Sequence, residues 1–420
     1  MSSGSKPVQR RQVFYIPGYD PIHPRRYREL YRKESASQAE VSGYEITLSP
    51  GQGGTRYGWH VDATIDGHDT QADFQVLVWS DIVKDSMDQG IFATYLQLIR
   101  TAWTYIASGA LFRLMKLRKG PVIAALYPVG FLMVQLVIAL FVAYWVWWGI
   151  VEGWNAMFKG PEDWFAPGLF IVLYAAIPVG LWVGYMLLRW FKSKDNKLFA
   201  YYLMHDYAYS AASKGTNPPE LEARMAEFTD EIAEALQGDA DEVLVVGHSS
   251  GAHLGVSILS DLIRQGRVPE DGPVLSFLTL GQVVPMVSFL RDAHRLRADL
   301  QFLSMRNELS WIDVTAPGDG CAFALCDPVG VSGVAPTGKR WPLVMSAAFT
   351  QTLSPERWKA LRWRFFRLHF QYLCAFDRPG DYDYFQITAG PIPLGERYEG
   401  RAPSPSRIEH SISKYTSVAP

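Results

Sequence analysis

The alternation of apolar and polar positions predicts short strands near both ends of the chain. The apolar runs that fit strands are residues 12–16, 44–48, 57–65 and 74–80, followed much later by 242–246, 272–281 and 309–315. Helical periodicity separates the later strands, at residues 198–213, 218–236 and 252–262. Strands that alternate with helices are typical of a mostly parallel sheet with flanking helices, so we expect an α/β fold.

Two long uncharged stretches interrupt this pattern in the middle of the chain. Pro121 to Val151 contains no charged residue, and neither does Trp164 to Leu188. Each stretch is longer than the roughly 20 apolar residues that cross a bilayer, so we expect two transmembrane helices.

An amphipathic segment precedes these stretches. Phe92, Leu96, Ile99, Trp103 and Ile106 recur at helical spacing, and the segment ends in a basic group made of Arg113, Lys116, Arg118 and Lys119. A helix with one apolar face and a basic end is typical of a membrane interface, although a buried helix has the same spacing. We therefore expect an interfacial helix over residues 91–119.

The charges around the two apolar stretches predict their orientation. The outer flanks are rich in Lys and Arg, whereas the short connector holds Glu152, Lys159, Glu162 and Asp163. Because basic flanks stay on the cytoplasmic side, residues 120–191 should form a transmembrane hairpin in the cytoplasmic (inner) membrane. The N-terminus lacks the apolar core of a signal peptide. We expect a multi-pass protein with two helices, whose α/β domain and both termini are cytoplasmic.

These assignments give the following domain organisation. Residues 1–11 are expected to be a disordered tail and residues 396–420 a mobile tail. Residues 12–90 and 198–395 are expected to be two parts of one α/β domain.

A short motif lies where a strand gives way to a helix. Gly247-His248-Ser249-Ser250-Gly251 follows the apolar run 242–246 and precedes the helical pattern from Ala252. A serine at such a corner has strained backbone and an exposed hydroxyl, as in a nucleophile elbow, and the glycines allow strand and helix to approach closely. The motif indicates that Ser249 is a nucleophile. An ordinary strand-to-helix turn with a serine cap is the alternative.

A second glycine loop follows the first predicted strand. Pro17-Gly18-Tyr19-Asp20 comes directly after residues 12–16. A backbone N–H can face a developing negative charge where no side chain intervenes, so Gly18, Tyr19 and Ser250 are candidates for an oxyanion hole. A plain Pro-Gly turn remains the alternative for the Gly18 loop.

A serine nucleophile needs a base, and the base needs a carboxylate. Asp319 lies in a turn after the predicted strand 309–315, with Asp313 and Asp327 as rivals. His369 is the candidate base, because His294 precedes every candidate acid and His410 lies in the C-terminal tail. Ordinary turn chemistry for the aspartates, and a polar position in an aromatic-rich helix for His369, are the alternatives.

Composition excludes some classes of partner. The formal net charge of -2 gives no basic field, so nucleic acid is not expected as a partner. Cys321, Cys326 and Cys374 form no metal-ligand pattern, and we expect no metal and no other cofactor. The 14 tryptophans favour contact with the lipid bilayer.

In the order Gly18 loop, Gly247-His248-Ser249-Ser250-Gly251, Asp319 and His369, the chain resembles the α/β-hydrolase superfamily. The resemblance covers residues 12–82 and about 198–390, with the hairpin as an insertion, and it is to lipase-like and esterase-like members. It implies a membrane-anchored serine hydrolase that cleaves an acyl ester, and the hairpin suggests a lipid as the substrate. An acyltransferase that uses the same triad and a non-catalytic membrane scaffold are the alternatives. The hairpin also allows a homo-oligomer.

Overall fold

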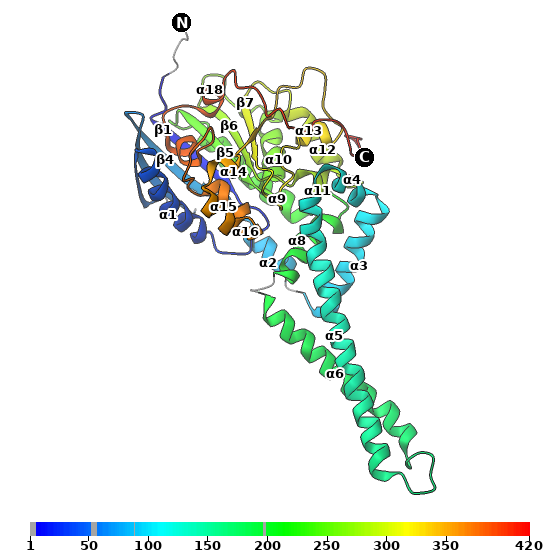
Figure 1. Cartoon of the computed structure of the whole chain (residues 1–420). Coiled ribbons are helices and arrows are strands. Elements are labelled where there is room, and N and C mark those ends of the chain that lie inside the picture. Colours follow the sequence, from blue (N-terminus) through cyan, green and yellow to red (C-terminus); the bar gives the residue numbers. More distant parts are fainter. Residues whose placement is uncertain (1–5, 52–56, 88, 196–198) are drawn as a thin grey trace. The chain divides into compact units, whose positions relative to one another are not determined.

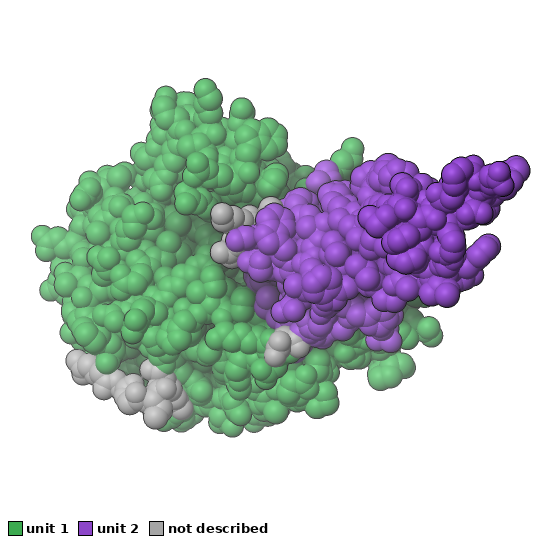
Figure 2. All heavy atoms as spheres, turned by 90° about the horizontal axis from the view of Figure 1, so that it is seen from below, with its two compact units in different colours: residues 1–86, 103–122, 210–420 green, residues 87–102, 123–209 purple. Residues whose placement is uncertain are grey.

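The computed structural model describes residues 6–51, 57–87, 89–195 and 199–420. The chain divides into two compact units, shown in Figure 2. Unit 1 comprises residues 1–86, 103–122 and 210–420, and unit 2 comprises residues 87–102 and 123–209. The α/β domain is therefore assembled from three separate chain segments.

Within the described residues, unit 1 contains one sheet of eight strands in the order β2-β3-β4-β1-β5-β6-β7-β8 (Figure 1). The strands are β1 (Arg10–Ile16), β2 (Glu45–Pro50), β3 (Gly58–Ile65), β4 (His68–Val76), β5 (Glu242–His248), β6 (Val274–Leu280), β7 (Leu309–Thr315) and β8 (Leu343–Ser346). β3 is antiparallel to both of its neighbours, and the other pairings are parallel. This arrangement confirms the expected α/β class with a mostly parallel sheet.

Helices cover both faces of the sheet. On one face, Val13, Tyr15, Leu244 and Val246 join a core cluster with residues of α1 (Arg25–Ser42) and α17 (Tyr384–Ala389). On the other face lies α10 (Gly251–Arg264), where a Cβ added at Gly255 would lie 2.7 Å from the Phe277 ring. Because both faces are covered, β5 is buried along its whole length.

Unit 1 also contains further helices, most of them short. They are α2 (Ser80–Met87), α4 (Ala110–Leu117), α9 (Pro219–Ala235), α11 (Val284–Ser288), α12 (His294–Leu303), α13 (Pro328–Val331), α14 (Phe349–Thr352), α15 (Pro355–Leu361), α16 (Phe365–His369), the 3₁₀ helix η1 (Gln371–Leu373) and α18 (Leu394–Arg397). The last residue of α2 lies in unit 2.

The largest differences between the predicted and the observed strands are at β4 and β8. β7 has the predicted bounds, but β4 begins six residues before the predicted strand because the turn is at Asp66 and Gly67, which both have positive φ. β8 was not predicted. It has only four residues, which is too short for an alternation to be recognised.

Both expected tails are wrong in extent. Arg10 and Arg11 belong to β1, and the Arg11 side chain is fully buried against Glu242. At the other end, the backbone N–H of Ser404 donates to Val344, and Ile408 forms an isolated β-bridge with Cys326. The C-terminal segment is thus held along unit 1 by backbone hydrogen bonds, which its Ser- and Pro-rich composition does not reveal. Residues 1–5 of the expected N-terminal tail lie outside the described residues.

Unit 2 is built from helices. α5 (Lys119–Phe158) extends beyond both ends of the first predicted apolar stretch, α6 (Leu169–Ser193) begins five residues after the start of the second and ends five residues after its end, and α8 (Ala200–Ala212) follows. α5 and α6 approach closely where Gly180 and Gly184 face the backbone of Ala143 and Ala139. In the described part of the chain, α5 and α6 are the two helices long and apolar enough to cross a membrane.

The expected single interfacial helix is two helices. α3 (Ile91–Ala107) ends near Gly109, whose φ of 72° cannot continue a helix, and α4 begins at Ala110. The predicted apolar face of α3 is exposed, with 84% of Phe92 and 73% of Trp103 accessible. The unit boundary falls within α3, after residue 102, rather than at either end of the predicted segment.

Candidate active site

Ser249 occupies a strained corner between β5 and α10. Its φ of 56° places a non-glycine residue in the left-handed region, which costs about 1–3 kcal/mol. The backbone N–H of Ser249 donates to Leu280 O at 2.9 Å, at the end of the neighbouring strand β6. This is the backbone geometry of a serine whose hydroxyl is presented at the carboxyl edge of a sheet.

Two glycines make the corner possible. A Cβ at Gly247 would lie 2.7 Å from Gly251 O, and a Cβ at Gly251 would collide with Ile16 O, 2.1 Å away. Side chains at these positions would separate β5, α10 and the end of β1. The spacing of glycines in the motif therefore has a local steric reason.

The Gly18 loop lies directly against Ser249. A Cβ added at Gly18 would be 2.9 Å from Ser249 Cβ and 3.4 Å from Ser249 Oγ. Within the described residues, no hydrogen bond uses the backbone N–H of Gly18 or Ser250. These two groups are therefore available to a ligand beside the hydroxyl.

Tyr19 has a different place from that of its neighbour Gly18. Its hydroxyl hydrogen-bonds to Ser86 Oγ, and its ring contacts Trp79 edge to face. The Trp79 indole N–H in turn donates to Pro17 O at 3.0 Å. The Tyr19 side chain thus fixes the loop, and only its backbone remains a candidate for binding an oxyanion.

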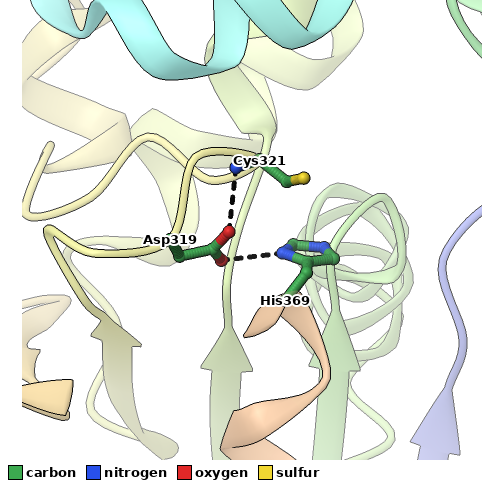
Figure 3. Close-up of side chains that lie close together, drawn as sticks. All are labelled: Asp319, Cys321 and His369. Atoms are coloured by element: carbon green, nitrogen blue, oxygen red, sulfur yellow. Dashed lines mark hydrogen bonds and ion pairs between the residues drawn. The ribbon is translucent and has the colours of Figure 1, made fainter. Parts of the chain in front are cut away.

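The Asp319 carboxylate and the His369 imidazole form a buried pair. Nδ1 of His369 lies 2.7 Å from Asp319 Oδ2, as Figure 3 shows. Asp319 lies in the loop after β7 and His369 at the end of α16, after β8. Because a carboxylate only accepts, Nδ1 carries the proton and Nε2 of the neutral ring has the free lone pair.

The two rival aspartates have other partners. Asp313 accepts a hydrogen bond from Thr279 Oγ1 at 2.6 Å, and burial raises its pKa to about 8. Asp327 caps α13 and forms an ion pair with Lys339. Of the three candidates, only Asp319 contacts a described histidine.

The other two histidines considered as the base, His294 and His410, lie elsewhere in the fold. His294 Nδ1 lies 3.3 Å from Ser417 O in the C-terminal segment, and its neighbour Arg297 contacts the same nitrogen. His410 lies in that segment and is exposed. Neither is placed beside Asp319.

Leu280 and Gly281 connect the serine to the histidine. Leu280 O accepts the Ser249 N–H, and a Cβ added at Gly281 would lie 3.0 Å from His369 Cε1. The side chains of Ser249 and His369 therefore both lie at the end of β6. No hydrogen bond joins Ser249 Oγ to His369 within the described residues; such catalytic bonds often form only when a substrate is bound.

Tyr372 and His248 complete this arrangement, and sequence analysis did not assign them a role. The Tyr372 hydroxyl accepts the Ala316 N–H at 2.9 Å and donates to Asp319 Oδ2 at 3.1 Å. Burial and the Asp319 charge raise the pKa of Tyr372 well above its usual value, so it stays a donor. The spacing of Tyr372 three residues after His369 was the available signal.

His248 holds the histidine segment from the nucleophile side. Its Nε2 lies 3.0 Å from the backbone O of His369, and the two rings are 4.8 Å apart. Burial, aided by the nearby His369, lowers the pKa of His248 well below its usual value. The neutral ring therefore donates one hydrogen bond that ties His369 to β5.

One cationic side chain approaches the site from α1. The Arg26 guanidinium lies 4.4 Å from the centre of the Phe370 ring and pairs with the Asp20 carboxylate at 3.1 Å. Tyr27 also donates to Asp20, at 2.8 Å. This group links the loop that carries Gly18 to the residue after His369.

The fold also gathers three side chains that could hold a metal ion, contrary to the absence of a ligand pattern in the sequence. Asp319, Cys321 and His369 each offer one ligand atom, and these atoms lie within 4.8 Å of one another. The sequence does not reveal the group because Asp319 and Cys321 lie in the loop after β7, whereas His369 lies at the end of α16, 50 residues after Asp319.

Comparison of the chain with family models, with curated proteins and with solved structures gives no match.

Proposed function

We propose that the protein is a serine hydrolase of the α/β-hydrolase type that cleaves an acyl ester at a membrane surface. The observation that carries the proposal is the strained backbone of Ser249, which lies beside Gly18 and near the Asp319–His369 pair. Strain of this kind persists where the surrounding structure enforces it, and it is concentrated at functional sites.

The order of the elements supports the same conclusion. The Gly18 loop follows β1, Ser249 follows β5, Asp319 follows β7 and His369 follows β8. β1 and β5 are adjacent, and the chain continues from them to opposite sides of the sheet. Open α/β sheets bind their ligands at such a point, outside the carboxyl ends of the strands.

The residues then have the following roles. Nε2 of His369 accepts the hydroxyl proton while Ser249 Oγ forms a bond to the acyl carbonyl carbon. The carbonyl π electrons move to oxygen, and the N–H groups of Ser250 and of Gly18 or Tyr19 stabilise this oxyanion. When the tetrahedral intermediate collapses, the bond to the leaving oxygen breaks and His369 gives that oxygen the proton. Water repeats the sequence and releases the acid.

The membrane part of the proposal rests on unit 2. α5 and α6 are apolar, and in each helix only 22% of an apolar segment of 18 residues is buried. A hairpin that crosses the membrane with its basic flanks in the cytoplasm would anchor the α/β domain on the cytoplasmic side of that membrane. An ester of a membrane lipid is then the substrate class that we propose.

A fluorophosphonate probe tests the serine directly in the full chain solubilised in detergent. We expect the wild type to be labelled, Ser249→Ala to be unlabelled, and Ser37→Ala, which alters an exposed serine of α1, to be labelled like the wild type. Labelling of Ser249→Ala, or a folded but unlabelled wild type, would exclude this mechanism.

Variants of the other residues test their roles. Asp319→Asn and His369→Ala should each slow labelling by about 10²-fold or more, because the serine then lacks an oriented base. Gly18→Ala should slow it by about 10-fold or more, because the added methyl group contacts Ser249. Products formed from a lipid ester, with and without an added alcohol, then distinguish hydrolysis from acyl transfer.

A further inference from the structure

A thiol lies beside the proposed acid and base. In Figure 3 the side chain of Cys321 extends over the His369 ring, while Asp319 faces the ring from the side. The three ligand atoms lie within 4.8 Å of one another. The mechanism proposed above uses Asp319 and His369 but gives the Cys321 side chain no role.

The loop after β7 determines where this thiol lies. The Cys321 backbone N–H donates to Asp319 Oδ1 at 2.8 Å, and the Asp319 N–H donates to Ala316 O at 2.9 Å. The Tyr372 hydroxyl holds the other carboxylate oxygen. The carboxylate, the imidazole and the loop that carries the thiol are therefore positioned before any ligand arrives.

The three groups also differ in exposure. Asp319 and His369 are buried, whereas Cys321 is partly accessible. An ion from solvent can therefore reach the thiol first and the two buried ligands afterwards.

The donor set selects the kind of ion. Sulfur, imidazole nitrogen and carboxylate oxygen are the ligands of Zn²⁺, whereas Mg²⁺ and Ca²⁺ favour sets made of oxygen alone. Three protein ligands leave one position of a tetrahedral ion for water.

We infer that Asp319, Cys321 and His369 form a Zn²⁺ site, and that Zn²⁺ bound there reversibly inhibits the enzyme. The inhibitory part rests on the proposed function, but the binding of the metal does not.

The required movements are small. With bonds of about 2.0–2.3 Å, ligand atoms of a tetrahedral zinc ion lie roughly 3.3–3.8 Å apart. The Asp319–His369 contact of 2.7 Å must therefore open slightly, and the most distant pair of ligand atoms, which lie within 4.8 Å, must close by at most about 1–1.5 Å.

Inhibition follows from the position of one proton. Zn²⁺ binding releases the thiol proton of Cys321 to solvent. If the ion binds Nε2 of His369, it occupies the lone pair that would accept the Ser249 proton. If it binds Nδ1, the ring proton moves to Nε2. In both cases the base is lost and no bond to substrate forms.

The binding test uses the detergent-solubilised full chain after treatment with a chelator. Zn²⁺ is titrated in competition with a chromophoric chelator, which reports binding without any catalytic turnover. We expect the wild type and Cys374→Ala, which removes a different thiol, to bind one Zn²⁺ per chain. Cys321→Ala should weaken this binding by about 100-fold or more, because a thiolate ligand is lost.

Two results would overturn the site. One is a wild type that binds no Zn²⁺, and the other is Cys321→Ala binding as tightly as Cys374→Ala. Cys321→Ser keeps the size of the side chain, so weaker binding by a folded Cys321→Ser variant as well excludes misfolding as the cause.

Fluorophosphonate labelling with and without Zn²⁺ tests the inhibition. Zn²⁺ should lower the labelling rate of the wild type and of Cys374→Ala, and chelator should restore it, whereas the ratio for Cys321→Ala should stay near one. Zn²⁺ that binds without slowing the labelling would overturn the inhibition and leave the metal site. A wild type that is unlabelled even without Zn²⁺ would refute the proposed hydrolase, and the titration would still decide whether the metal binds.

Discussion

Units 1 and 2 place the same kinds of side chain in opposite environments. In unit 1, Trp59 and Phe74 stack with ring centres 4.8 Å apart, and both are buried. In unit 2, Trp164 is 87% exposed, Phe170 is 75% exposed and Trp182 is 62% exposed. Unit 1 buries this stacked pair in its core, although it exposes Trp363, whereas unit 2 leaves the rings of Trp164, Phe170 and Trp182 uncovered. Exposed apolar surface of this extent is typical of a surface that contacts another apolar phase or a partner.

Buried polar groups sharpen the contrast. Unit 1 buries the Arg11–Glu242 ion pair completely and gives both side chains further hydrogen-bond partners. Arg11 donates to Gly390 O at 2.6 Å and Ile392 O at 3.0 Å, and Glu242 accepts from Ser276 at 2.6 Å. Such a pair is stable only where every partner is in place.

The largest effect is expected from breaking this pair. Arg11→Ala should lower the free energy of unfolding by about 3–5 kcal/mol, because Glu242 would remain as a buried charge without its partner. Arg10→Ala removes an exposed pair with Asp239 and should cost less than about 1 kcal/mol. Denaturant midpoints of the two variants measure the difference. Equal midpoints would mean that residues 10 and 11 are a tail after all.

A charge in α6 tests the opposite environment. Leu181 is 56% exposed at the middle of α6, and Leu181→Lys should disfavour membrane insertion by about 3 kcal/mol. Met305 in unit 1 is 40% exposed, and Met305→Lys should change stability by only about 0.5 kcal/mol. The fraction that sediments with membranes after an alkaline wash reports insertion. If both variants sediment like the wild type, unit 2 does not face lipid at Leu181.

A smaller effect is expected at the candidate active site of unit 1. Tyr372→Phe removes the hydroxyl that donates to Asp319 Oδ2 and accepts the Ala316 N–H, so the carboxylate that orients the His369 ring is held less firmly. Fluorophosphonate labelling should slow by up to about tenfold, because a hydrogen bond to a charged group is lost. A labelling rate equal to that of the wild type would show that the hydroxyl does not position Asp319. Tyr398→Phe, which removes a hydroxyl bonded to Asp381 O, is the control.

A pH-dependent effect is expected from Asp313, which is buried in β7, next to the edge strand β8. Its pKa of about 8 in the folded protein exceeds that of an unfolded chain, so the folded state holds a proton that the unfolded state releases. Stability from this group is present below about pH 4 and is lost as the pH rises through about 8. Asp313→Asn should flatten the fall in stability between about pH 4 and pH 8. Parallel curves of stability against pH for wild type and variant over this range would contradict the raised pKa.

Local chemistry made part of this architecture predictable. The strand, turn and helix around Ser249 lie within one continuous segment, so their spacing is visible in the sequence. The uncharged lengths of α5 and α6 are equally local. Asp319 could be preferred over Asp313 and Asp327 as the acid only because it lies in a turn after a strand. Its contact with His369 could not be predicted from the spacing of residues in the sequence.

Contacts between residues far apart in the sequence limited how much of the fold could be predicted. The position of β1 between β4 and β5 depends on contacts between residues more than 200 positions apart, which no periodicity encodes. The same limit applies to Ile408 beside Cys326 and to Tyr372 beside Asp319. The roles of Ser249, Asp319, His369 and the oxyanion donors stay predictions until the labelling experiments are done.

The discontinuity of unit 1 has a consequence for synthesis of the protein. Gly18 follows β1 near the start of the chain and Ser249 follows β5, so residues 17–241, including both apolar helices, must be translated between these strands. At about 5–20 residues per second, this interval takes roughly 10–45 s. The β1–β5 pairing that brings Gly18 to Ser249 therefore cannot form until α5 and α6 have left the ribosome. If the proposed function is correct, both apolar helices can therefore enter a membrane before Ser249 can become reactive.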